Sequence, residues 1–171
     1  MKKCKHCEEP FQPYNSLQKF CFKKECTKVW VKKQKEKQWR KRKRELKEEL
    51  ETVQSLMKKA QKVFNEFIRL RDKENCISCG KPLGDKYDAG HYIASTYKVH
   101  TFNENNVHSQ CVHCNQYLSA NLLEYRKALI NKIGSDAVWW LEQTKHQEYK
   151  PTREELKQLI ETYKKKIADL K

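Results

Sequence analysis

Two Cys-x-x-Cys pairs, at positions 76 and 79 and at positions 111 and 114, constrain the fold of this chain more than any other feature. A turn of this spacing can aim both sulfur atoms at one ion, and zinc binds four such ligands in a tetrahedron, each about 2.3 Å away. The two pairs therefore predict one zinc site, formed by Cys76, Cys79, Cys111 and Cys114. Four thiolates leave no open coordination position, so this zinc is expected to stabilise the fold and to activate no water.

The other four cysteines form a second set near the start of the chain. Cys4 and Cys7 have the same close spacing, whereas four residues separate Cys21 from Cys26. This set predicts a small zinc ribbon or knuckle over residues 1–27, with a second structural zinc. Its aromatic side chains are expected to surround the metal: Phe11, Tyr14, Phe20 and Phe22. The knuckle either only stabilises the fold or also binds a DNA junction or a protein partner, and both alternatives stay open here.

Eight cysteines can also indicate disulfides. Here the pairs have metal spacing and no signal peptide opens the chain, so a reducing cytoplasm is expected. No apolar run approaches the roughly 20 residues of a membrane span, so no membrane partner is expected. Only 37% of the residues are hydrophobic, and zinc is expected to compensate for a small core.

The charge of the chain indicates a nucleic-acid partner. Lys and Arg number 37 against 22 Asp and Glu, which gives a formal net charge of +15. Residues 1–75 carry a net charge of +12 and residues 76–171 only +3, so most of the non-specific binding to phosphates is expected in the N-terminal part. A solvated basic helix is the alternative interpretation of this charge.

Residues 28–73 predict a long helical segment, because proline and glycine are absent and Lys, Arg, Glu and Gln dominate. The densest basic run follows Trp39 and is the candidate DNA-binding element: Arg40, Lys41, Arg42, Lys43 and Arg44. The second half carries a wide apolar stripe that includes Leu56, Phe64 and Phe67. This stripe is expected to pack on the zinc-containing core, with a dimer partner as the alternative.

Residues 135–171 predict C-terminal helices. Gly134 is expected to end the preceding helix, which spans Asn121 to Ile133. A last helix is expected after Pro151, because Thr152 and Glu155 have the spacing of a capping box. The core region is therefore expected over residues 74–134.

The segment between Cys79 and Cys111 is rich in His, Asn and Asp, which are the residue types of metal ligands and general bases. Two segments carry a resemblance to known protein families, CISCGKPLGDKYDAGHY and FNENNVHSQCVHCNQYLSANL. The chain resembles the phage NinG (Rap) recombination proteins and, more broadly, the HNH or ββα-metal nucleases with a Cys4 zinc. The resemblance implies a mainly α fold with a small α+β, zinc-braced ββα-metal core and the N-terminal knuckle. It also implies a structure-selective DNA endonuclease for Holliday junctions and D-loops in the infected bacterial cytoplasm.

The resemblance also implies roles for individual residues. His91 matches the general base and Asn106 matches the central asparagine, which orients the loop. Asn115 matches a ligand of the catalytic Mg²⁺ or Mn²⁺. The aspartate that usually precedes the histidine is Gly90 here, so Asp88 is the substitute ligand if residues 87–92 form a strand. The alternatives are a turn residue for Asp88 and a structural, hydrogen-bonded histidine for His91.

Another departure from the family pattern is Leu118, where relatives often have a lysine. Lys98 or Arg126 is then the candidate cation for the phosphate.

Other functions stay open at this stage. They are a non-catalytic DNA-binding recombination mediator, a general HNH nicking nuclease and an RNA-binding zinc-ribbon protein. Two symmetric cuts in a four-way junction make a homodimer a natural hypothesis, and phage or host recombination proteins are further candidate partners. Sequence preference of cleavage, the divalent metal used and the oligomeric state do not follow from the sequence.

Overall fold

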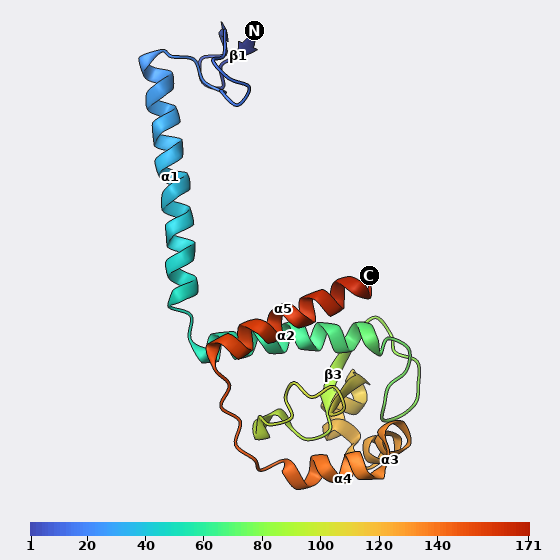
Figure 1. Ribbon diagram of the computed structural model, residues 1–171. Helices are drawn as coiled ribbons and strands as arrows, with labels where there is room; N and C mark the ends of the chain where they lie inside the picture. Colours follow the sequence, from blue (N-terminus) through green and yellow to red (C-terminus); the bar gives the residue numbers. More distant parts are fainter. The chain divides into compact units, whose positions relative to one another are not determined.

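The computed structural model describes residues 1–171 and separates into two units, residues 1–51 and residues 52–171 (Figure 1). Helices account for more than half of the chain, and each unit holds one small two-stranded sheet and one cluster of four cysteines. The mainly α character implied by the resemblance is therefore confirmed. No helix has both the length and the apolar character needed to cross a membrane.

The first unit is a short hairpin followed by one long helix. Strands β1 (Lys2–Lys3) and β2 (Pro10–Phe11) pair antiparallel, and α1 spans Lys24–Glu49. Cys4, Cys21 and Cys26 form the small core, against which Phe11 and Phe20 pack. The expectation that Tyr14 and Phe22 also surround the metal is wrong. Their side chains are 90% and 72% exposed, because the cysteine core is too small to cover them.

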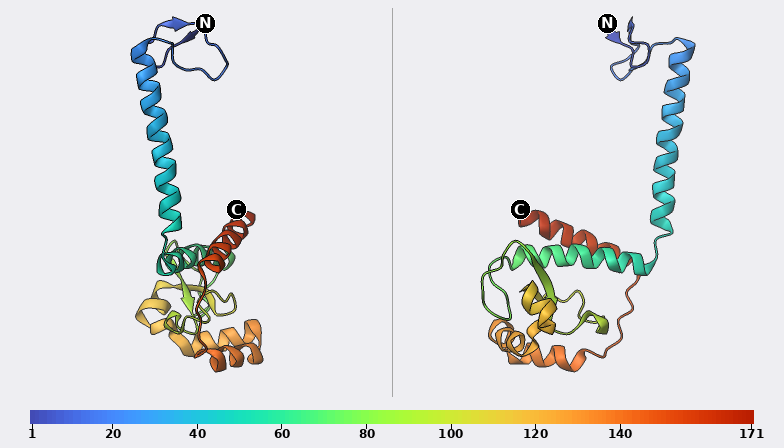
Figure 2. Two further views of the ribbon diagram at one scale, coloured as in Figure 1. Left: turned by 60° about the vertical axis from the view of Figure 1, so that its left-hand side comes forward. Right: turned by 180° about the vertical axis from the view of Figure 1, so that it is seen from behind.

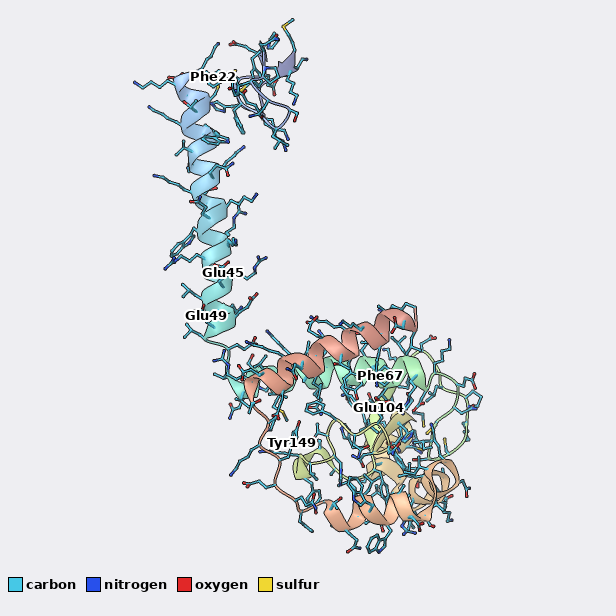
Figure 3. All side chains as sticks on the ribbon, viewed as in Figure 1. Phe22, Glu45, Glu49, Phe67, Glu104 and Tyr149 are labelled. Carbon is cyan, nitrogen blue, oxygen red and sulfur yellow. The ribbon has the colours of Figure 1, made fainter.

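Helix α1 is solvated along its length. Its one buried residue is Cys26, and in Figure 3 its side chains project on all sides of the helix. Residues of high helix propensity make up most of it, and ion pairs such as Lys41–Glu45 add a few tenths of a kcal/mol each. The basic run from Arg40 to Arg44 therefore faces solvent.

The single helical segment expected over residues 28–73 is two helices. Helix α1 ends at Glu49 and α2 begins at Val53 and runs to Arg71. Thr52 accepts a hydrogen bond from the Ser55 N–H at 3.2 Å, so it starts α2 as an N-cap. The boundary between the two units falls at this break, between residues 51 and 52.

The second unit is built on the contact between α2 and α5 (Arg153–Asp169), which run in the same direction (Figure 2). Leu56 and Ala60 pack on Leu156 and Ile160 at one end. At the other end the ring of Phe64 meets Tyr163 edge to face, with centroids 4.8 Å apart. The apolar stripe on α2 thus packs chiefly on α5, and it also contacts the expected zinc-containing core at Val107. The capping box of Thr152 and Glu155 is also confirmed.

A β-hairpin lies between this helix pair and a second helical layer. Strand β3 (Tyr87–His91) pairs antiparallel with β4 (Val107–Cys111), and His91 lies opposite Val107. The connecting loop contains the short helical turn η1 (Ser95–Tyr97). Glu104 fixes this loop to the helix pair, since its carboxylate contacts Tyr163, Lys166 and Arg71 (Figure 3).

The second layer follows β4 directly. A π-helical turn, η2 (His113–Tyr117), and a 3₁₀ turn, η3 (Ser119–Asn121), lead into α3 (Leu122–Ile133) and α4 (Ser135–Thr144). Gly134 separates α3 from α4 at φ +88°, as its position in the sequence predicts. Tyr125 and Leu129 of α3 and Val138 and Leu141 of α4 are buried together with Ile93. The hairpin is therefore enclosed on both faces.

Candidate functional site

The four cysteines of the second unit converge on one point. The Sγ atoms of Cys76, Cys79, Cys111 and Cys114 all lie within 4.8 Å of one another, and the Cys79–Cys111 Sγ distance is 3.9 Å. Tetrahedral zinc with bonds of about 2.3 Å requires sulfur atoms about 3.8 Å apart, whereas a disulfide requires about 2 Å. The donor set and its spacing therefore fit a Cys4 zinc site.

Backbone donors support the thiolate form of Cys76, whereas burial raises the pKa of Cys79 and raises that of Cys114 to about 12. Burial raises the pKa of Cys76, but the N–H groups of Cys79, Cys111 and Ser78 outweigh it and lower the pKa to about 7. Asn121 donates from Nδ2 to the Cys114 sulfur at 3.7 Å. Such donors are expected around a metal-bound thiolate, which must be deprotonated to bind.

The first unit holds an equivalent set. The Sγ atoms of Cys4, Cys7, Cys21 and Cys26 also lie within 4.8 Å of one another, and those of Cys7 and Cys21 are 3.7 Å apart. The Cys21 N–H donates to Cys4 Sγ at 3.3 Å. Burial raises the pKa of Cys4, and backbone hydrogen bonds lower it to about 6. Both predicted Cys4 clusters are thus assembled and could hold zinc.

The β3–β4 hairpin sorts the candidate residues onto two faces. Asp88 lies directly opposite Gln110, and Gly90 opposite His108, so these four share one face. Ala89 belongs to the other face, since it packs on the core of α2 and α5, and alternation places His91 on that face too.

Asp88 and Asn115 are in direct contact. Asn115 donates from Nδ2 to Asp88 Oδ2 at 2.9 Å, and Gln116 donates from Nε2 to the same oxygen at 2.8 Å. Asn115 and Gln116 belong to η2, which contains Cys114 and follows Cys111 of the same cysteine cluster. The substitute carboxylate and the amide assigned to the cation therefore meet, on the face shared with position 90.

His91 lies apart from this pair. Its Nε2 is 3.3 Å from the carbonyl oxygen of Thr101, and it is half-buried at the end of β3. Burial lowers its pKa, while the Thr101 and Ala89 carbonyls raise it by less. The imidazole is therefore neutral at pH 7. If Nε2–H donates to Thr101, Nδ1 carries the lone pair that a base needs.

Asn106 makes the contacts expected of an orienting residue. It is fully buried, and its Oδ1 accepts from the Ile93 N–H at 2.7 Å. Its Nδ2 donates to the carbonyls of Ile93 and His100, both at 3.0 Å. Asn106 thereby closes the loop whose Thr101 carbonyl contacts His91.

Gln110 is the residue that inspection of the sequence missed. It is fully buried, and its Nε2 donates to Ser78 Oγ at 2.6 Å and to the Ala120 carbonyl at 2.7 Å. Its Oε1 has no hydrogen-bond partner and lies 1.8 Å from where a Cβ on Gly90 would stand. The carboxamide of Gln110 thus fills the space of a side chain at position 90. A glycine inside a strand was the available signal, because it often marks a close approach.

The segment held by Gln110 is strained. Ser119, Ala120 and Asn121 all have positive φ, at 48°, 67° and 45°. Three successive non-glycine residues in this region are rare, and such strain persists only where surrounding contacts enforce it. Here Ser78 also donates to the Ala120 carbonyl, at 3.2 Å. Ser78, next to the zinc-binding cysteines, and Gln110 of β4 therefore both hold the turn that follows Asn115.

Comparison with known proteins gives the family. The family described as Bacteriophage Lambda NinG protein matches residues 1–171. The chain belongs to the NinG family. Protein ninG of Escherichia phage lambda is 44% identical over 117 residues, which cover 67% of this chain and 57% of that protein. Protein ninG of Escherichia phage 933W is 36% identical over an alignment of 189 positions, which covers 99% of this chain and 94% of that protein. No solved structure matches the chain significantly.

The candidate phosphate-binding cations of this NinG-family chain differ in availability. Arg126 is engaged by Glu142, with Nε and Oε1 2.7 Å apart. Lys98 is exposed and follows η1 at φ +57°. Leu118, at the position where a lysine was expected, is 47% exposed. Lys98 is therefore the more available of the two substitutes.

Proposed function

We propose that this NinG-family chain is a metal-dependent DNA endonuclease that cuts branched recombination intermediates such as Holliday junctions and D-loops. The observation that supports it best is the contact between Asp88 and Asn115 beside a zinc-braced hairpin. A carboxylate and an amide oxygen are the ligand types that Mg²⁺ and Mn²⁺ prefer. Rotation of the Asn115 amide by about half a turn would bring its Oδ1 to the side of the carboxylate.

A bound divalent cation would neutralise charge on the phosphate and stabilise the leaving oxygen. The residues of the chain supply the remaining requirements. His91 is neutral at pH 7 and is the proposed base for the attacking water, with Nδ1 as acceptor. Asn106 and the Thr101 carbonyl hold the ring in place. Since the pKa of His91 is below its ordinary value of about 6.5, cleavage should fall only at a pH lower than that.

The test is nicking of a synthetic four-way junction and of a linear duplex of matched sequence, in Mg²⁺ and in Mn²⁺. The proposal expects wild type to cut the junction, and His91→Ala to lose at least about 100-fold in rate while junction binding persists. His146→Ala is the matched control, since His146 is exposed in the same unit and outside the site. Equal cutting of linear duplex would indicate a general nicking nuclease instead.

A second function is favoured by the position of His91. Asp88 and His91 are three residues apart on β3, which places their Cα atoms roughly 10 Å apart with side chains on opposite faces. This arrangement suits a non-catalytic DNA-binding mediator in which the zinc fold is a scaffold. That function predicts junction binding without nicking in either cation, and unchanged binding by His91→Ala.

Homodimerisation and binding to other recombination proteins belong to the same proposal. Two symmetric cuts require two active sites, so the junction-bound form should be a dimer by light scattering. Competition between branched DNA and structured RNA tests the remaining alternative, an RNA-binding function.

A further inference from the structure

The first unit carries a groove lined by apolar side chains that nothing covers. It has a volume of about 580 Å³, and its lining includes Tyr14, Leu17, Phe20, Phe22, Trp30 and Gln34. Tyr14 is 90% exposed, Leu17 82% and Phe22 72%. In Figure 3, Phe22 marks the point where the knuckle joins α1. Exposed apolar side chains gathered in one place, and not scattered singly, indicate a binding surface.

Hydrogen bonds hold the loop that carries these side chains. The Tyr14 N–H donates to Gln18 Oε1 at 2.7 Å, and the Leu17 N–H donates to Asn15 Oδ1 at 3.0 Å. Gln18 in turn donates to the Phe20 carbonyl at 2.9 Å. The following residue, Cys21, belongs to the cysteine cluster. The groove is therefore a preorganised feature of the knuckle.

The surroundings of the groove are cationic. Residues 1–51 hold 17 Lys and Arg against 8 Asp and Glu, a net charge of +9. Lys19 lines the groove, and Lys33 Nζ lies 5.4 Å from the centre of the Phe20 ring. Aromatic rings beside lysines form the surface that binds unpaired nucleic acid, in which bases stack on rings while cations contact phosphates. An apolar protein segment would match the rings but not this charge.

We infer that this groove binds unpaired nucleobases of DNA, which stack on Tyr14, Phe22 and Trp30 while Lys19 and Lys33 contact the flanking phosphates. A D-loop exposes such bases in its displaced single strand. The site deepens the proposed function by giving the basic unit a preference for unpaired DNA. It does not require cleavage, because stacking by the first unit involves neither His91 nor Asp88.

Binding to three probes separates stacking from charge. The full-length, zinc-loaded chain is titrated with a thymidine oligonucleotide, with an abasic oligonucleotide of the same length, and with linear duplex. The abasic probe has the phosphates but no bases. Wild type should bind the thymidine probe at least about tenfold more tightly than the abasic one, because stacking contributes about 1–3 kcal/mol per base.

The decisive variant is the double substitution Tyr14→Ala and Phe22→Ala. Both side chains are largely exposed, so the variant should keep both zinc ions by metal analysis. It should lose the preference for thymidine over abasic DNA while its affinity for the abasic probe changes by less than about twofold. Trp39→Ala is the control, since Trp39 is 65% exposed on α1 but outside the groove, and it should keep the preference.

Two outcomes would overturn the inference. One is equal affinity of wild type for thymidine and abasic probes. The other is an unchanged preference in the double variant, which would leave the groove to a protein ligand. The His91→Ala chain distinguishes failure of the groove inference from failure of the nuclease proposal. If it and wild type both prefer the thymidine probe over the abasic one and neither cuts DNA, the nuclease proposal fails and the groove inference stands.

Discussion

Gly90 shows how one residue can decide the composition of a site. A Cβ at this position would lie 1.8 Å from Gln110 Oε1 and 2.6 Å from Cδ. Gln110 cannot easily move, because Ser78 and the Ala120 carbonyl both fix its amide nitrogen. Since Ala120 offers only an acceptor there, rotating the amide would place two oxygens in contact. A carboxylate side chain at position 90 is thus incompatible with Gln110 in this position.

Gly90→Ala should therefore destabilise the second unit by about 1–3 kcal/mol, the usual effect of overpacking. Urea unfolding of the zinc-loaded chain measures it. Gly84→Ala is the matched control, since a Cβ there meets nothing within 4 Å, and it should change stability by less than about 0.5 kcal/mol. Adding Gln110→Ala should make the Gly90 substitution less damaging than it is alone. Purely additive effects of the two substitutions would contradict the proposed clash.

His108 should make stability depend on pH. Burial, with the charges of Lys132 and Arg71, lowers its pKa to about 3, although Asp72 opposes the shift. Tyr125 OH lies 3.3 Å from its Nδ1, as suits a neutral ring. As pH falls, His108 binds a proton in the unfolded chain before it does so in the folded chain. The contribution of neutral His108 to the free energy of unfolding is therefore complete above about pH 6.5 and declines as pH falls toward 3.

Below pH 6.5, protonation of His108 should lower the free energy of unfolding by up to about 1.4 kcal/mol per pH unit. His108→Gln should remove this part of the slope in urea unfolding between pH 7 and pH 5. His91 and His100, whose pKa values are also lowered by burial, remain in both chains, as do the cysteine clusters. The difference between the two chains therefore isolates His108, and parallel slopes would refute its role.

At the scale of elements, the sequence indicated the parts whose causes are local. Helix propensity and the Thr152 capping box predicted helices, and Cys-x-x-Cys spacing predicted both clusters. The break at Leu50 to Thr52 was missed, because a threonine N-cap without proline or glycine is a weak signal beside a long run of helix formers. The exposure of Tyr14 and Phe22 was missed because the core available to them is a property of the folded knuckle.

The candidate site could be predicted in part for the same reason. Alternation along β3 placed Asp88 on the side of position 90, and the structure has this arrangement. The contact of Asp88 with Asn115 depends on how η2 packs, which the sequence does not show. His91 directly follows Gly90 on β3, so the same alternation places it on the opposite face from Asp88. Gly90 inside a strand signalled a close approach but could not identify Gln110, because the role of Gln110 depends on a glycine, a serine and a carbonyl brought together from three segments.

At the scale of the whole molecule, the two units should respond differently to loss of zinc. The core of the first unit consists of cysteines with Phe11 and Phe20 against them. The second unit also has the α2–α5 core and the Tyr125 cluster, neither of which depends on a metal. Chelation should therefore unfold residues 1–23 completely, while α2 and α5 keep much of their protection in hydrogen exchange. Restored zinc should reverse the change, and protected residues 1–23 in the chelated chain would rule this out.

The break between α1 and α2 joins two structural units through only Leu50, Glu51 and Thr52. A tether this short keeps the local concentration of one unit near the other in about the millimolar range. If both units bind the same DNA molecule, as proposed, two weak contacts would combine as avidity, with no new contact between protein and DNA. Separately expressed halves would lose that gain, even if each retained its own fold and its own affinity.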